Sequence, residues 1–294
     1  MCIRDSTMPA SQPMRKCIVG PFRNDWEFIT SDMLRFVETP PAVAPFAIVR
    51  YGDGERALIE NRPLGQGTQA FTEDKFWSPG GETEVGRDLA WSLTGHYGHR
   101  YYYGFASPYD DAAGLLNYLK LTEQHCGFIT YANLFVNSNY QGTKALLQKL
   151  LDSHLHKLVL VVNHVSAQGL LDRFDRERVV PVISLPDDAT FAYTGATRLG
   201  LIANVTAAAR QHSGMLFLVS GGPMAKPLIS HMWAASQRNS YIDLGSSMDE
   251  LLKGRITRPY MTAGTKYATQ VDPDFILTSS MQDTRELGPT RRRR

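Results

Sequence analysis

The sequence predicts an α/β fold, a single domain in which a Rossmann-like, mostly parallel sheet is covered by helices on both faces. Short apolar runs of strand length alternate with amphipathic helical stretches in the second half of the 294-residue chain. Strands separated by helices of this length pair in parallel through right-handed crossovers. The chain shows no internal repeat and no low-complexity linker that would divide it, so one sheet is expected.

The first elements are expected to lead into this sheet. Residues 1–13 read as a translated cloning or sequencing-adaptor scar, and residues 14–45 are predicted to form a helical prefix. Apolar side chains at helical spacing predict a helix over 24–37, which a cluster of prolines ends. The apolar run 46–51 predicts a buried strand, and a helix is expected over 55–61.

The remaining elements continue this alternation. The glycine- and proline-containing stretch 63–81 predicts a loop. Strands are predicted over 101–106, 126–135, 158–162, 179–185, 215–219 and 241–244. Helices are predicted over 85–93, 110–121, 141–155, 167–173, 197–211, 224–236 and 248–252.

Composition argues against several classes of protein. The chain has 31 basic and 29 acidic residues, and without the four arginines at 291–294 the balance is 27 to 29, so nucleic-acid binding is not expected. Cys2, Cys17 and Cys126 lack metal-binding spacing and fit a reducing, cytoplasmic setting. No apolar run approaches the roughly 20 residues that span a bilayer, so no transmembrane segment is expected.

The first candidate site is the junction between the strand at 46–51 and the next helix. Residues 50–55 read Arg-Tyr-Gly-Asp-Gly-Glu, so Gly52 and Gly54 permit a sharp turn around Asp53. Asp53 and Glu55 there form a hard-oxygen pair suited to Mg²⁺ or Mn²⁺. In the alternative interpretation, Asp53 caps the helix and Glu55 pairs with a neighbouring arginine, Arg50 or Arg56.

Two further strand ends carry glycines or an acid. Gly221 and Gly222 follow the strand at 215–219 and allow close approach of a phosphate or nucleotide, although an ordinary tight turn has the same composition. Asp243 lies inside the apolar strand at 241–244. A buried carboxylate is costly unless it is paired, so Asp243 is expected to have a partner.

These three junctions resemble the GT-D type of glycosyltransferase, a bacterial family first known as a domain of unknown function. Residues 50–55 look like its R-[FY]-G-D-G-E segment, which contains the metal-associated D-x-E motif. Residues 222–225 resemble its G-P-x-A turn, and residues 242–245 resemble its D-[IL]-G strand end. The resemblance covers roughly residues 46–253, with one departure at Ser246, where several members carry histidine.

The resemblance implies transfer of a sugar from a nucleotide-sugar donor, typically a UDP-sugar, to a glycan or other hydroxyl acceptor. It implies a catalytic domain over 46–255; the residue pattern itself predicts an irregular tail over 256–294. Asp53 and Glu55 are the expected catalytic residues and ligands of Mn²⁺ or Mg²⁺, which would compensate charge on the leaving diphosphate. The expected donor-binding residues are Arg50, Gly52, Gly54, Gly221, Gly222 and Asp243.

Other functions stay open at this point. Carboxylates at a strand end also serve metal-dependent phosphohydrolases and nucleotidyl-type enzymes, and a non-catalytic nucleotide-binding module would bind UDP without regard to Mn²⁺ or Asp53. An inverting transfer would also need a base for the acceptor hydroxyl. The candidates by residue type are Asp187, Asp188, Asp249, Glu250 and His164.

Overall fold

The computed structural model centres on one seven-stranded sheet in which every paired strand is parallel, as the sequence predicts. It describes residues 22–61, 83–95, 97, 100–105, 114, 117–118, 120–122, 128–163, 168, 182–186 and 192–265. The strand order is β3-β2-β1-β7-β6-β4-β5. The strands are β1 (Ala47–Tyr51), β2 (Tyr101–Phe105), β3 (Phe128–Tyr131), β4 (Leu158–Asn163), β5 (Val182–Leu185), β6 (Leu216–Ser220) and β7 (Ser240–Asp243).

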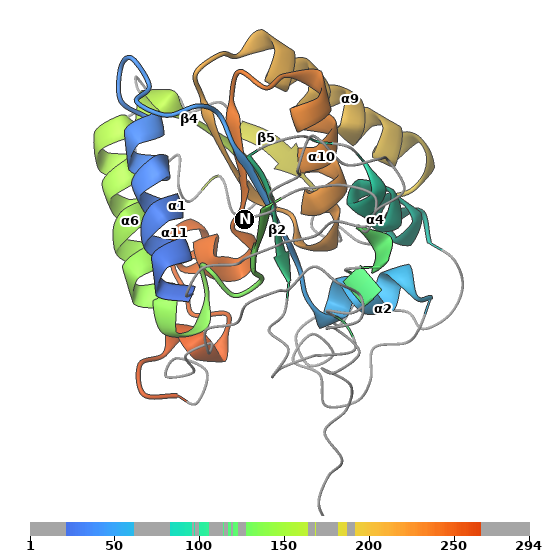
Figure 1. Cartoon of the computed structure of the whole chain (residues 1–294), viewed down its shortest axis with the longest axis horizontal. Helices are drawn as coiled ribbons and strands as arrows, with labels where there is room; N and C mark the ends of the chain where they lie inside the picture. The colour runs from blue at the N-terminus through green and yellow to red at the C-terminus, as the bar shows by residue number, and fades with distance from the viewer. Residues whose placement is uncertain are drawn as a thin grey trace, which may run out of the picture.

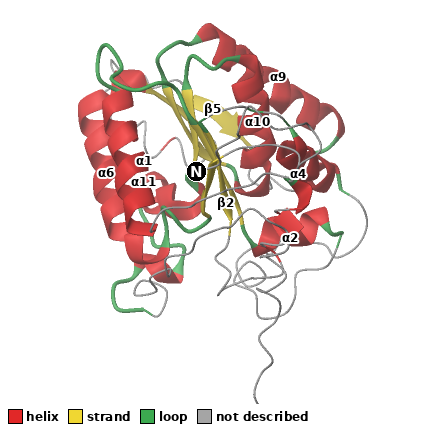
Figure 2. Cartoon of the chain, in the orientation of Figure 1, coloured by secondary structure: helices red, strands yellow, loops and turns green. Residues whose placement is uncertain are grey.

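Helices cover both faces of the sheet (Figures 1 and 2). One layer holds α1 (Phe22–Phe36), α6 (Tyr140–His154) and α11 (Asp249–Lys253). The other holds α2 (Asp53–Ile59), α4 (Glu84–Thr94), α9 (Gly195–Gln211) and α10 (Ala225–Ala235). Short 3₁₀ helices are η1 (Asn137–Asn139), η2 (Leu155–Lys157), η3 (Gly222–Met224), η4 (Gly245–Met248) and η5 (Pro259–Met261).

The central strands are buried on both faces, which explains their continuous apolar runs. All five residues of β2 and all four of β7 are buried, and β4 exposes only its last residue in part. Parallel strands covered by helices on both sides require this composition, because neither face contacts water. Among the described helices, none combines the length and apolar character that crossing a membrane would require.

Most predicted elements are found within one or two residues of their expected bounds. The strand expected over 126–135 is wrong in its second half, because β3 ends at Tyr131, where its pairing with Phe105 of β2 ends. The chain then turns, and the Leu134 N–H bonds to the Tyr131 carbonyl. The predicted loop at 63–81 and most of the predicted helices at 110–121 and 167–173 lie outside the described residues.

Candidate functional site

The bend after β1 is built by Gly52 and Glu55. Gly52 is the N-cap residue of α2, and its N–H donates to Glu55 Oε2 at 2.9 Å. A glutamate three residues into a helix satisfies a backbone donor that the helix itself leaves unpaired. The Gly52 carbonyl in turn accepts from the Tyr118 hydroxyl at 2.6 Å. The turn is therefore fixed by its own acid and by a tyrosine from a distant part of the chain.

Asp243 ends β7 next to this bend, and its side chain is fully buried. Its carboxylate accepts the backbone N–H of Arg50 at 3.3 Å and that of Gly245 at 3.1 Å. The Arg50 guanidinium lies 3.9 Å from the same carboxylate. The prediction that this buried acid has a partner is confirmed.

Arg50 joins three strands at their carboxyl ends. Its Nε donates to the main-chain carbonyl of Asp243 at 2.9 Å, and a terminal nitrogen donates to the carbonyl of Ala132, just beyond β3, at 2.9 Å. The guanidinium is 11% exposed. The planar fork of an arginine suits this work, because its several N–H donors point in fixed directions.

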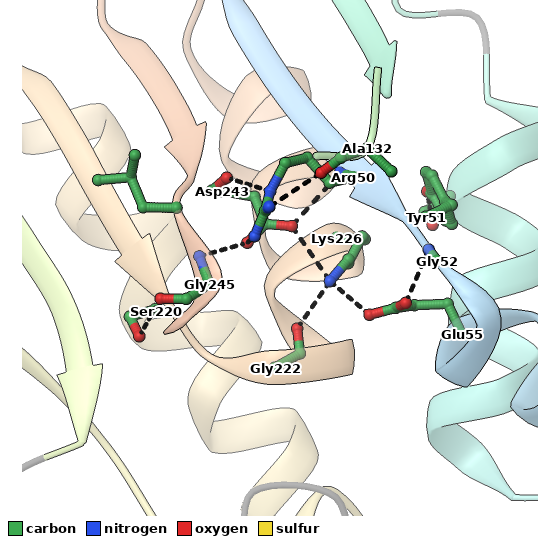
Figure 3. A network of polar contacts seen from close by, with 12 residues as sticks. Arg50, Tyr51, Gly52, Glu55, Ala132, Ser220, Gly222, Lys226, Asp243 and Gly245 are labelled. Carbon is green, nitrogen blue, oxygen red and sulfur yellow. Dashed lines mark hydrogen bonds and ion pairs between the residues drawn. The ribbon is translucent and has the colours of Figure 1, made fainter. Parts of the chain in front are cut away.

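Lys226 lies between the two acids (Figure 3). It belongs to the first turn of α10, and its side chain is only 4% exposed. Its Nζ lies 2.6 Å from Glu55 Oε1, 3.1 Å from Asp243 Oδ2 and 3.1 Å from the Gly222 carbonyl. An ammonium has three N–H donors, so these three partners use all of them.

The four charged residues Arg50, Glu55, Lys226 and Asp243 are called here the strand-end network. The network combines all three junctions selected from the sequence, because Glu55 follows β1, Lys226 follows the Gly221-Gly222 turn, and Asp243 ends β7. It contains two positive and two negative groups, whose formal charges cancel. Mutual pairing of this kind is what allows charges to be buried.

Electrostatics keeps the central pair ionised. Burial alone raises the pKa of the Glu55 carboxyl, but the Lys226 ammonium and the Gly52 N–H outweigh burial and lower that pKa below its ordinary value. Burial alone lowers the pKa of Lys226, but Asp243 and Glu55 outweigh it and raise that pKa. The lowered pKa means that ionised Glu55 stabilises the fold above its unfolded pKa of about 4.3, a contribution lost as the pH falls through the folded value.

Two glycines in the site have positive φ angles that other residues rarely adopt. Gly222 has φ +55° and Gly245 has φ +52°. A Cβ on Gly245 would lie 2.2 Å from an Arg50 guanidinium nitrogen, so glycine is needed there for space as well as for conformation. Gly221 packs closely too, since a Cβ there would lie 2.7 Å from Leu185 of β5.

The C-terminal part of the described chain closes one side of the site. The Ser246 hydroxyl pairs with the Tyr260 hydroxyl of η5 at 2.8 Å, and the Ser220 hydroxyl donates to the Gly245 carbonyl at 2.8 Å. Burial is the main cause that raises the pKa of Tyr260 to about 12. Residues 256–265, which the sequence analysis assigned to an irregular tail, therefore contain a short helix packed beside the site.

The other predicted site residues are placed as follows. Asp53 begins α2, but its side chain lies outside the described residues, as do His164, Asp187 and Asp188. Gly54 lies in the first turn of α2. Two of the candidate bases, Asp249 and Glu250, are already paired. Asp249 contacts Thr257 and Lys253, and Glu250 accepts from Tyr140 and Lys144.

Lys226 is the residue that sequence reasoning missed. One interpretation of the sequence paired Glu55 with a neighbouring arginine, but its partner is a lysine 171 positions away. A signal was present, because Lys226 is the one lysine or arginine in α10, whose sequence AKPLISHMWAA is mostly apolar. A cation on a buried helix needs an anionic partner, and Asp243 was already expected to need one.

The described residues of the site offer limited ligands to a divalent ion. Glu55 contributes a carboxylate of the hard-oxygen type that Mg²⁺ and Mn²⁺ prefer. Among the described residues, the N–H groups of Gly52 and of Glu55 itself and the Lys226 ammonium donate to this carboxylate, which has roughly four lone-pair sites. Among the described residues, no group of three or more His, Cys, Asp or Glu side chains gathers to hold a metal. The chemistry of Glu55 fits such an ion on its remaining lone pairs, whereas the point between Glu55 and Asp243 is filled by Lys226.

Comparisons with known proteins gave only structural matches. No family model and no curated protein matches the chain. A structure described as a new glycosyltransferase, domain of unknown function 1792, from Streptococcus sanguinis is 16% identical, covers 82% of this chain and 86% of its own, and has a TM-score of 0.48. Another, described as domain of unknown function 1792 with a distinct glycosyltransferase fold, is 17% identical, covers 88% and 92%, and has a TM-score of 0.45.

Proposed function

We propose that this chain is a metal-dependent glycosyltransferase that moves a sugar from a nucleotide-sugar, most simply a UDP-sugar, to a glycan or other hydroxyl acceptor. The observation that carries the proposal is the strand-end network. Three motifs that are far apart in the sequence, and that together resemble one glycosyltransferase family, meet at the carboxyl ends of β1, β6 and β7. Ligands of open parallel sheets bind at this edge.

The proposed reaction explains why charged groups would be placed at the carboxyl ends of these strands. Glycosyl transfer leaves negative charge on a nucleoside diphosphate, and fixed positive charge in a site sheltered from water stabilises such a leaving group. In the proposal, Asp53 and Glu55 hold Mn²⁺ or Mg²⁺, which supplies that compensation when bound. Gly52, Gly54, Gly221 and Gly222 allow the backbone to approach the donor.

Arg50 and Asp243 have a positioning role in the proposal. The Arg50 side chain donates to the main-chain carbonyls of Asp243 and Ala132. The Asp243 carboxylate accepts from the backbone N–H groups of Arg50 and Gly245 and pairs with the Lys226 ammonium. Both side chains are almost fully enclosed. They therefore hold the three strand ends in register around the donor, as the supporting residues of a preorganised site do.

Calorimetric titration with UDP, with and without Mn²⁺, tests the proposal. The wild-type chain is expected to bind UDP at least about tenfold more tightly with Mn²⁺ than without it, a difference of about 1.4 kcal/mol. Asp53→Asn and Glu55→Gln are each expected to remove most of that gain. Glu250→Gln is the matched control, because Glu250 also pairs with a lysine, Lys144, outside the strand-end network.

The outcomes separate the alternatives. UDP affinity that is the same with and without Mn²⁺ in the wild type and both variants would contradict the metal site and favour a binding module. A chain that binds UDP with Mn²⁺ but releases phosphate without ever transferring sugar to an acceptor mixture would favour the phosphohydrolase. Because Glu55 also pairs with Lys226, a thermal melt of Glu55→Gln must accompany its titration.

A further inference from the structure

We infer that the Lys226 ammonium keeps a divalent ion from binding to Glu55 until the nucleotide arrives, so that the ion and the diphosphate bind together. The inference rests on the proposed function and gives Lys226 a role of its own within the strand-end network. Its basis is the position of the Lys226 ammonium, within hydrogen-bond distance of one oxygen from each of two carboxylates.

The Lys226 ammonium occupies a position where two carboxylates converge. Glu55 and Asp243 come from different strand ends, and Nζ lies 2.6 Å from Oε1 of one and 3.1 Å from Oδ2 of the other. Two carboxylates that converge on one point form a cation site by their charge. In this chain that cation is the Lys226 ammonium, and the lysine side chain is only 4% exposed.

The strand-end network offers an incoming divalent ion no excess of negative charge. The strand-end network carries no net formal charge, because Arg50 and Lys226 balance Glu55 and Asp243. An ion ligated by Glu55 would lie about 2.1 Å from a carboxylate oxygen, and therefore within a few ångströms of the ammonium. Repulsion at that distance is strong where water is largely excluded. The free protein is therefore a weak site for a divalent ion.

The nucleotide changes this balance of charge. A diphosphate brings several negative charges, which compensate both the divalent ion and the lysine. Each ligand then improves the affinity for the other by the same factor, as thermodynamic linkage requires. Lys226 thus makes ion binding depend on the donor. Removing a residue that ligates the ion would weaken binding of the ion alone. Removing Lys226 is instead expected to strengthen it, which distinguishes the two roles.

The test measures Mn²⁺ binding without nucleotide by electron paramagnetic resonance, in which bound Mn²⁺ loses the sharp signal of the free ion. Lys226→Ala is expected to bind Mn²⁺ alone at least about tenfold more tightly than the wild type, since it leaves Glu55 without its cation and gives the network one net negative charge. The double variant Lys226→Ala with Glu55→Gln is expected to lose this gain. Lys144→Ala is the matched control, because it frees the single carboxylate of Glu250 and should change nothing.

A second variant guards against misfolding. Lys226→Gln removes the same charge but keeps a polar side chain for Glu55 and Asp243, and it is expected to change Mn²⁺ affinity in the same direction. Thermal melts of both variants, with and without Mn²⁺, give an independent reading, because an ion that binds only the folded state raises the melting temperature. A folded variant that binds Mn²⁺ no more tightly than the wild type would overturn the inference.

The wild-type chain decides the question without any variant. It is expected to bind Mn²⁺ weakly alone and much more tightly when UDP is added, and equal affinity in the two conditions would also overturn the inference. Failure of the proposed function has a different signature. If UDP does not bind at all, the sugar-nucleotide donor is wrong, while the gain of Mn²⁺ binding on removal of Lys226 can still be read.

Discussion

The strand-end network and a second polar cluster, which lies between two helices, both pair carboxylates that are shielded from water, but they do so in different ways. In the helix cluster, Asp88 of α4 accepts from the Tyr193 hydroxyl at 2.8 Å and from two nitrogens of Arg198 of α9 at 2.6 and 2.7 Å. Burial and the nearby Asp88 charge raise the pKa of Tyr193, so the tyrosine stays a neutral donor. One acid is thus saturated by neighbours from the helix layer, and the arginine remains 23% exposed.

The strand-end network, by contrast, encloses four charges from three strand ends, and two of them, Lys226 and Asp243, are 4% and 0% exposed. Removing charges from water is costly, and apolar residues of similar volume often stabilise a fold as well or better. The helix cluster is a structural contact that holds α4 against α9. Burying the four charges of the strand-end network costs more desolvation free energy than a structural contact requires, so we assign the network to function.

The largest expected effect follows from removing the acid that both cations share. Asp243→Ala leaves Arg50 and Lys226 buried with only Glu55 to balance them. We expect a loss of about 3–5 kcal/mol in the free energy of unfolding, measured by urea denaturation. Loss of less than about 1 kcal/mol would show that the enclosed charges rehydrate easily, and the contrast with the helix cluster would disappear.

A smaller effect is expected from Gly245→Ala. The substitution places a Cβ at φ +52° and 2.2 Å from an Arg50 nitrogen, so it strains the backbone and displaces the guanidinium. We expect about 2–3 kcal/mol of destabilisation together with weaker UDP binding. Gly254→Ala is the control, because Gly254 has φ +65° and nothing within 4 Å of its Cβ position. Equal losses in the two variants would mean that only backbone strain is measured.

The same contrast explains how much the sequence could predict. Alternating apolar runs predicted the parallel sheet, because a strand buried on both faces must be apolar throughout. Gly52, Glu55 and Asp243 were selected because glycines and acids at the carboxyl ends of parallel strands are typical of ligand sites, although helix capping and ion pairing were an open alternative for the acid at Glu55. The sequence also indicated that Asp243 needs a partner, and two cations, Arg50 and Lys226, meet that need.

Pairing across the chain was the part that could not be predicted. Lys226 reaches Glu55 over 171 positions because the strand order places β1, β7 and β6 side by side, and no local pattern encodes that order. The end of β3 was misplaced for a similar reason, since the apolar residues Leu134 and Phe135 after it are buried in a turn and read as strand. Local patterns predict elements, whereas the partners of buried charges depend on topology.

Asp88→Asn tests the other half of the comparison. The variant keeps the shape of the side chain but weakens its contacts with Arg198 and Tyr193, and the partly exposed arginine can regain water. We expect about 1–2 kcal/mol of destabilisation in urea and unchanged UDP affinity with Mn²⁺. A clear loss of UDP binding in a folded variant would mean that the α4–α9 contact also shapes the site.

The smallest effect is expected from Lys253→Ala, which removes an ion pair of ordinary surface type. Lys253 lies 3.1 Å from Asp249 one turn earlier in α11, and its side chain is 34% exposed. Pairs of this kind contribute about 0.5 kcal/mol or less, because solvent screens them and the lysine regains conformational freedom when the pair is lost. The free energy of unfolding should therefore change by no more than that amount. A loss as large as that of Asp243→Ala would show that charge pairing as such, and not enclosure at the strand ends, sets the cost of breaking a pair in this protein.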